Sequence, residues 1–248
     1  MKTLIAKSTR QLLRCVGRPV FATSDQVLRV EQSFYKQYIR QGMTVFDVGA
    51  NVGKTALLFA PLVDQGAVHA FEASSSTFCS LVDRCQEANQ YNIVLNNCAV
   101  TKYEGKVTLQ VYDEEHSSWN SLARRPLEDY GIDVKPVGTE EVLATTIDSY
   151  CEKRGIEQID LLKIDVEGAE YQVLLGARRM LQDRRVKCCV FEFGQTTFDM
   201  GNHPDAIEAY ISEIGYSLRN LVAKDPIFPG RSTAKSAQFS MHIITPGL

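Results

Sequence analysis

A short apolar run, Thr44–Val48 (TVFDV), passes directly into the glycine loop Gly49–Gly53 and then into a helical segment, Lys54–Val63. Two further apolar runs follow, Ala67–Phe71 (AVHAF) and Ile93–Asn96, separated by a second helical segment that opens with serines able to cap it. Continuous apolar strands that alternate with helices are typical of a parallel sheet covered on both faces. We therefore predict an α/β fold with a mostly parallel sheet and helices on both sides.

The later part of the chain departs from this pattern and then returns to it. Lys106–Tyr112 alternates polar and apolar residues, which indicates an antiparallel excursion, and the polar stretch 113–138 is expected to be a loop. Helices and strands then alternate again, and the last two strands are expected to form an antiparallel edge. The expected segments are the helices Ile147–Arg154, Ala169–Leu181 and Pro204–Ile214 and the strands Ile159–Ile164, Cys188–Phe193, Tyr216–Val222 and Gln238–Ile244.

The length of 248 residues suits one α/β domain with a short appendage. We place this domain at residues 41–248 and predict that residues 1–40 form a helical extension or cap. Its first apolar side chains fall near helical spacing, which indicates an amphipathic helix: Leu4, Ile5, Leu12, Leu13 and Val16. Only basic charges precede Asp25, so a targeting or polyanion-binding role is the alternative to packing on the domain.

Composition and charge argue against several classes of protein. The formal net charge of −3 gives no reason to expect nucleic acid as a partner. No apolar run approaches the roughly 20 residues that span a bilayer, so stable membrane insertion is not expected. The seven cysteines are scattered and never in CxxC spacing, which opposes a disulfide framework or a thiolate zinc site and favours a cytoplasmic compartment. No feature specifies the oligomeric state.

The glycine loop and an acidic residue beyond it indicate a ligand that contains a nucleoside. In an α/β sheet of this kind a crevice opens at the carboxyl ends of the strands, and Gly49 and Gly53 permit a tight turn there. Glu72 ends the next strand, where its carboxylate can accept hydrogen bonds from both hydroxyls of a ribose.

The loop sequence also distinguishes between two nucleoside cofactors. A loop that binds a dinucleotide would have glycines where Asn51 and Lys54 stand. Asp47, just before the loop, would repel a pyrophosphate but suits a ligand that carries an ammonium group. We therefore predict S-adenosylmethionine, and we do not favour an oxidoreductase that uses NAD.

Four blocks of the sequence, taken in order, resemble the FkbM family of methyltransferases. These blocks are FDVGANVG (Phe46–Gly53), AFEAS (Ala70–Ser74), NNCAV (Asn96–Val100) and IDLLKIDVEGAEYQVLLGARRML (Ile159–Leu181), of which the last is the most specific. One departure is Ala73, where the family often has proline. The resemblance implies a Rossmann-like class I methyltransferase fold, and usually O-methylation of a hydroxyl on a secondary metabolite, sugar or glycolipid.

The resemblance also assigns residues to the methyl donor. It implies contacts of the methionine part with Asp47, Gly49, Asn51 and Gly53, of the ribose with Glu72, and of the adenine with Asn97 and Cys98. Ser121 resembles the family's serine-leucine element near the cofactor, and a simple polar loop is the alternative.

Asp165 is the predicted catalytic residue. It ends a strand at the sheet edge where the methyl group would be presented, and an alcohol is a poor nucleophile unless a base removes or shares its proton. The alternative is that Asp165 only caps the helix that follows it. Glu170, on that helix, is expected to be solvated or ion-paired.

A divalent metal is possible at this edge but is not favoured. Glu192 ends the neighbouring strand, so Asp165 and Glu192 could together hold Mg²⁺. However, Glu192 lies between two phenylalanines, Lys163 could pair with a carboxylate, and further oxygen ligands would have to come from Glu167 or a loop. We therefore predict metal-independent catalysis with Asp165 as the base.

The predicted function is that of an S-adenosylmethionine-dependent methyltransferase that acts on a hydroxyl of a small molecule or saccharide in secondary metabolism. Two alternatives stay open. One is N-methylation of a small-molecule amine, which needs less help from a base, and the other is a non-catalytic module that only binds the nucleoside. The acceptor itself is not specified, because loops build the acceptor pocket in folds of this class.

Overall fold

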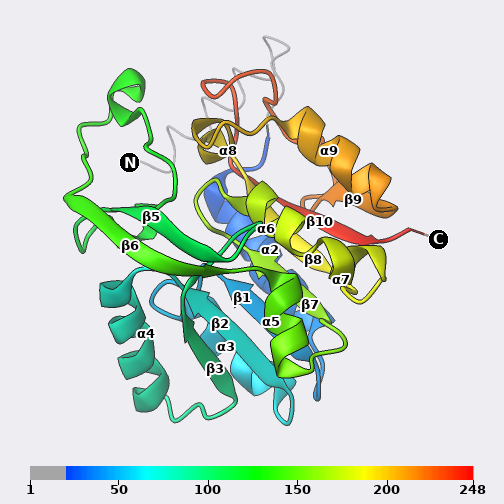
Figure 1. The fold of residues 1–248 in the computed structure, drawn as a ribbon. Coiled ribbons are helices and arrows are strands. Elements are labelled where there is room, and N and C mark those ends of the chain that lie inside the picture. The colour runs from blue at the N-terminus through cyan, green and yellow to red at the C-terminus, as the bar shows by residue number, and fades with distance from the viewer. Residues whose placement is uncertain (1–20, 248) are drawn as a thin grey trace, which may run out of the picture.

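The computed structural model describes residues 21–247, which fold around a seven-stranded sheet with the strand order β3-β2-β1-β7-β8-β10-β9 (Figure 1). The first five strands of this order are parallel: β3 (Ile93–Asn97), β2 (Ala67–Glu72), β1 (Thr44–Val48), β7 (Leu161–Ile164) and β8 (Cys189–Phe193). β10 (Ser240–Pro246) runs antiparallel to both β8 and β9 (Tyr216–Asn220). The predicted parallel sheet with an antiparallel edge is confirmed.

Helices cover both faces of this sheet, as the alternating pattern predicts. One face is packed by α2 (Ser24–Tyr38), α3 (Lys54–Val63) and α4 (Ser75–Glu87). The other face is packed by α5 (Ile147–Arg154), α6 (Glu170–Gly176), α7 (Arg178–Gln182) and α9 (Pro204–Glu213). A short helix, α8 (Gln195–Asp199), follows β8. Within the described part of the chain, no helix is both long enough and apolar enough to cross a membrane.

The alternation of side chains along the strands decides which polar groups lie on which face. Val45 on β1, Leu161 on β7 and Val190 on β8 belong to the core beneath α2 and α3. The residue two positions further along each strand points to the same face, because side chains repeat with a period of two. Asp47 and Lys163 therefore lie on the α2 side of the sheet, near its carboxyl edge, and so does the residue two positions after Val190, a glutamate.

The segment just before the sheet is part of the folded core. Val27 and Tyr35 of α2 are each only 1% exposed and pack on the sheet. The helix begins after Thr23, whose backbone N–H donates to the side-chain oxygen of Gln26 at 3.1 Å. A helix therefore lies within the region predicted to be an extension, whereas the amphipathic helix expected near Leu4–Val16 lies outside the described residues.

A second sheet of three strands, in the order β4-β6-β5, projects from the carboxyl edge of the main sheet. β4 (Ala99–Val100) is short, and β5 (Gly105–Val111) runs antiparallel to β6 (Gly138–Thr145). The antiparallel excursion is confirmed for β5, but its partner β6 has no counterpart among the predicted strands. β6 exposes one face to solvent, where Leu143 is 63% exposed, so its alternation of apolar and polar residues is weak.

The prediction of one helix over Ala169–Leu181 is wrong, because the helix is interrupted at Ala177, between α6 and α7. The break follows Gly176, where a Cβ would overlap the backbone oxygen of Thr101, so β4 and α6 approach closely. The carboxylate of Asp148 accepts the backbone N–H groups of Arg179 and Met180 at 2.8 and 2.9 Å and so caps the new helix from outside.

Candidate active site

A cavity of about 260 Å³ opens at the carboxyl ends of β1, β2 and β7. β1 is the strand at which the sheet order changes direction, which is where α/β folds place ligands. Six predicted site residues line this cavity: Gly49, Asn51, Glu72, Cys98, Ser121 and Asp165. Three others, Asp47, Gly53 and Asn97, lie outside its lining. Parts of the chain separated by more than a hundred residues thus meet at one opening.

The glycine loop is shaped by the fold as well as by any ligand. Gly49 has φ +79°, and a Cβ there would overlap the backbone oxygen of Asp165. Gly53 has φ +84° and stands just before α3, and a Cβ there would press on the side chain of Leu81. Glycine is therefore required at position 49 for the loop to pack against the turn after β7, and at position 53 the positive φ favours glycine.

Glu72 presents a carboxylate to the cavity from the end of β2. It is 7% exposed, and its two oxygens accept the backbone N–H groups of Asn51 and Ser74, both at 2.9 Å. Burial raises the pKa of Glu72, although these N–H groups favour the charged form. The side-chain amide of Asn97 donates to the backbone oxygens of Glu72 and Ala73, so Asn97 supports this strand end without lining the cavity.

Cys98 contributes an apolar part of the wall beside Ala99 and Val100. Burial raises the pKa of the Cys98 thiol to about 11, so the thiol is neutral at physiological pH. A neutral thiol among small apolar residues suits the flat face of a ring more than it suits a charged group.

Lys163 occupies the floor of the site, with its side chain 4% exposed. Its ammonium lies 3.1 Å from Asp47 Oδ1 and 3.3 Å from Asp165 Oδ2, and it donates to the backbone oxygen of Gly49 at 3.3 Å. Asp47 and Lys163 are register partners in the parallel strands β1 and β7, so their side chains stand next to each other. The carboxylate of Asp47, with no exposed surface, is thus directed at Lys163 beneath the loop, and the structure does not bring it to the cavity.

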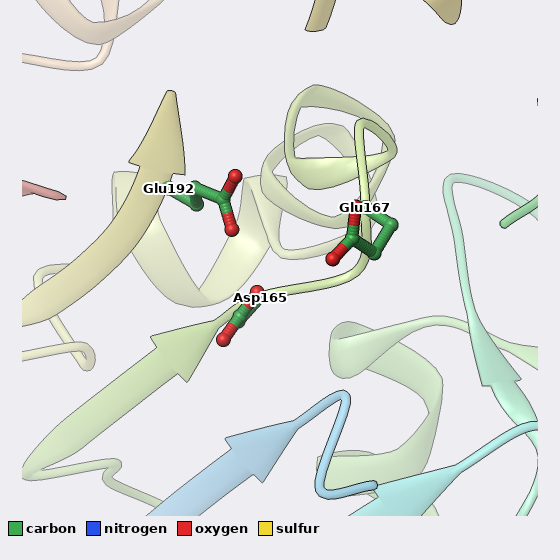
Figure 2. Close-up of side chains that lie close together, drawn as sticks. All are labelled: Asp165, Glu167 and Glu192. Carbon is green, nitrogen blue, oxygen red and sulfur yellow. The ribbon is translucent and has the colours of Figure 1, made fainter. Parts of the chain in front are cut away.

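Three acidic side chains converge at the carboxyl edge. Asp165 follows β7, Glu167 lies in the next turn, and Glu192 lies near the end of β8. Within residues 21–247, one carboxylate oxygen from each lies within 4.8 Å of the others, and Figure 2 shows the three groups turned toward one another. These three groups could supply oxygen ligands to a divalent cation. The structure thus brings Glu167, which the sequence names as a possible further ligand, next to Asp165 and Glu192.

Burial and mutual repulsion set the charges of this group. Burial, followed by the charge of Asp165, raises the pKa of Glu192 well above its ordinary value and that of Glu167 to about 8. Burial also opposes ionisation of Asp165, but the ammonium of Lys163 and a hydrogen bond from Glu192 together outweigh it and lower the pKa of Asp165. At neutral pH, Asp165 is therefore ionised, whereas Glu167 still carries a proton.

The expectation that Glu170 is solvated or ion-paired is wrong. Glu170 is 2% exposed, and one of its oxygens accepts the backbone N–H groups of Val166 and Gly168 at 3.0 and 3.1 Å. Burial raises its pKa to about 7. The turn that Glu170 holds is strained, because Glu167 has φ +52°. Glu170, and not Asp165, therefore satisfies the backbone ahead of α6.

The loop after β5 closes one side of the cavity. Ser121 donates from its hydroxyl to the backbone oxygen of Glu167 at 2.7 Å, which fixes the loop to the turn after β7. Arg125 lies 3.4 Å from Glu167 and 3.2 Å from Asp199, and Tyr130 donates to Asp199 at 2.6 Å. The sequence offers no signal for this contact, because Arg125 and Asp199 lie in separate segments that share no motif.

The parallel sheet with its antiparallel edge, and the cavity above a glycine loop, define a Rossmann-like domain of the kind found in methyltransferases. Residues 47–218 match the family model described as the methyltransferase FkbM domain, which is more than half of the chain. The chain therefore belongs to the FkbM methyltransferase family.

Individual relatives are distant. The 31-O-demethyl-FK506 methyltransferase FkbM of Streptomyces tacrolimicus is 27% identical over 219 residues, which cover 77% of this chain and 78% of that protein. The 2-O-methyltransferase NoeI of Sinorhizobium fredii is 25% identical over 167 residues, which cover 64% and 67%. The solved structure of a methyltransferase FkbM from Methylobacillus flagellatus matches 97% of this chain with a TM-score of 0.50 and 13% identity. This chain spans 60% of the length of that structure.

Proposed function

We propose that this protein transfers a methyl group from S-adenosylmethionine to a hydroxyl of a secondary metabolite or a saccharide. The observation that carries the proposal is the position of Asp165, a charged carboxylate that lines the same cavity as the glycine loop and Glu72. The names of two relatives support a hydroxyl acceptor, since one is a 2-O-methyltransferase and the other acts on a 31-O-demethyl compound.

The residues of the cavity fit the methyl donor. Glu72 would accept the ribose hydroxyls, the backbone at Gly49 and Asn51 would follow the methionine part, and Cys98 would lie against the adenine. The donor supplies an electrophilic methyl group on a sulfonium. Asp47 does not contact the donor directly in this proposal, because its carboxylate is paired with Lys163 beneath the loop.

Replacement of Glu72 tests this assignment. Glu72→Ala should cost roughly 2–4 kcal/mol of affinity for S-adenosylhomocysteine, because the ribose hydroxyls lose a buried charged acceptor. Calorimetry on the folded variant measures this loss. Glu141→Ala, which removes an exposed carboxylate paired with Lys106, is the control and should leave the affinity unchanged. Unchanged affinity in Glu72→Ala would remove Glu72 from the donor site.

Asp165 would act on the acceptor. As the acceptor oxygen forms a bond to the methyl carbon, the carbon–sulfur bond breaks, and its electron pair stays on sulfur. The proton of the hydroxyl passes to the carboxylate of Asp165. An ionised base next to the opening makes this transfer possible without a metal, and Glu167 keeps its proton beside it.

Asp165→Asn should lower kcat by about 10²–10⁴-fold and leave the affinity for S-adenosylhomocysteine nearly unchanged. Activity of the unaltered protein should survive EDTA. Complete loss of activity in EDTA, with recovery on addition of Mg²⁺ or Mn²⁺, would overturn the base assignment and make Asp165, Glu167 and Glu192 metal ligands.

The same assay decides between acceptor classes. Matched hydroxyl and amine acceptors should differ in favour of the hydroxyl, because the base that Asp165 supplies assists a hydroxyl, whereas a neutral amine gains nothing from it. Faster transfer to amines would favour N-methylation. Binding of S-adenosylhomocysteine without turnover of any acceptor would indicate that the protein is a non-catalytic module that binds the nucleoside.

A further inference from the structure

We propose that Lys163 is a positioning residue that fixes the catalytic carboxylate of Asp165 relative to the loop that holds the methyl donor. The inference rests on the function proposed above. One ammonium group contacts both halves of the site, since it lies 3.3 Å from Asp165 Oδ2 on the acceptor side and 3.3 Å from the backbone oxygen of Gly49 on the donor side.

The fold alone gives little reason for a lysine at this position. Lys163 is 3% exposed on a central strand of the sheet, and neighbouring positions on the strand carry leucine and isoleucine. Buried ion pairs can often be replaced by well-packed apolar residues without loss of stability, because the attraction hardly exceeds the cost of desolvation. The ammonium is therefore better explained by what it holds in place than by stability.

The contacts of Lys163 form a rigid unit. Asp47, its register partner on β1, anchors the ammonium from one side at 3.1 Å, and Glu31 of α2 adds a further negative charge nearby. The backbone of Gly49 already packs against the backbone of Asp165, as the overlap of a Cβ there demonstrates. Lys163 ties the side chain of Asp165 to this contact, so the carboxylate keeps a set direction toward an acceptor hydroxyl.

Such an arrangement affects rate more than binding. The donor loop is also held by the backbone N–H groups of Gly49 and Ala50, which both donate to the backbone oxygen of Phe71. Loss of the ammonium should therefore leave the donor loop in place and release only the carboxylate. A displacement of a catalytic group by about 1 Å can cost about 100-fold in rate.

The test uses Lys163→Met, which keeps the length of the side chain and removes its charge. Because this variant leaves Asp47 buried and unpaired and could fail to fold, the double variant Asp47→Asn/Lys163→Met is made beside it. In whichever of the two variants folds, kcat should be about 10- to 100-fold lower than in the unaltered protein. KM for the acceptor and the affinity for S-adenosylhomocysteine should stay within about threefold. Lys106→Met, at an exposed lysine paired with Glu141, is the control and should match the unaltered protein.

A mutant cycle with Asp165 separates positioning from a merely structural role. If Lys163 acts through Asp165, its replacement in an Asp165→Asn background should cost no further kcat. Equal losses in both backgrounds, or an unchanged kcat in the folded Lys163 variants, would overturn the inference. Absence of turnover by the unaltered protein on every acceptor would instead overturn the proposed function, and the inference with it.

Discussion

A side chain at position 49 would overlap the backbone oxygen of Asp165, whereas a side chain at Gly155 would meet nothing within 4 Å. Both glycines have positive φ, +79° and +65°. Gly155→Ala should therefore lose only about 1–2 kcal/mol of unfolding free energy, the cost of a left-handed backbone. Gly49→Ala should lose clearly more, because the loop must also move away from the turn after β7. Urea unfolding of the two variants makes the comparison, and equal losses would contradict the close packing of the two backbones.

Residues at the ends of parallel strands could be predicted from the sequence, because such ends meet at one edge of the sheet. Gly49, Glu72 and Asp165 all follow or end an apolar run, and all three line the cavity. The surroundings of Asp47 could not be predicted in the same way. Its partner Lys163 stands beside it only because β7 is the neighbour of β1, and a local motif carries no information on strand order.

The turn between β7 and α6 depends on a single buried side chain. Glu170→Ala would leave the N–H groups of Val166 and Gly168 without their acceptor and should cost about 2–4 kcal/mol of unfolding free energy. Glu170→Gln should cost less, since its amide oxygen can still accept both bonds and the replaced carboxyl has a pKa of about 7. Denaturant unfolding distinguishes the two variants. A similar loss in both would show that the charge, and not the hydrogen bonding, supports the turn.

The bounds of helices and strands could be predicted where the apolar pattern is strong. They were predicted wrongly where contacts between distant segments determine where an element ends. α3 and β1 have the bounds that the sequence predicts. The break between α6 and α7 depends on the approach of Gly176 to Thr101, and the loop after β5 is held by the contact of Arg125 with Asp199. No local spacing encodes either contact.

For the whole molecule, a modest net charge of −3 is accompanied by a concentrated group of acids near the carboxyl edge of the sheet. Six carboxyl groups interact with one another or with two cations, Lys163 and Arg125: Glu31, Asp47, Asp165, Glu167, Glu170 and Glu192. Such a group cannot remain fully ionised in a buried site, so the folded protein keeps protons that the unfolded chain releases.

These retained protons give stability an unusual dependence on pH. Burial raises the pKa of Glu170 to about 7 and that of Glu167 to about 8, whereas unfolded glutamates have a pKa of about 4.3. Between about pH 6.5 and 8.5 the folded state thus binds more protons than the unfolded state, and stability falls as pH rises, by up to about 1.4 kcal/mol per pH unit for each extra proton. Buried His69 and His242, with pKa values of about 4 and about 3, oppose this trend below about pH 7.5, because the unfolded imidazoles, with a pKa of about 6.5, take up protons there.

Thermal melting in EDTA across this pH range measures the effect, with about 2–4 °C expected for each kcal/mol in a chain of this size. Tm should decrease steadily from about pH 6.5 to 8.5. Glu167→Gln should flatten the curve, because the amide cannot release a proton, and Glu141→Gln at the exposed pair with Lys106 should leave it unchanged. If Tm of the unaltered protein stayed constant or rose over this range, Glu167 and Glu170 would be ionised in the folded state. Positive charge other than that of Lys163 and Arg125 would then be needed to stabilise the ionised acids at the carboxyl edge.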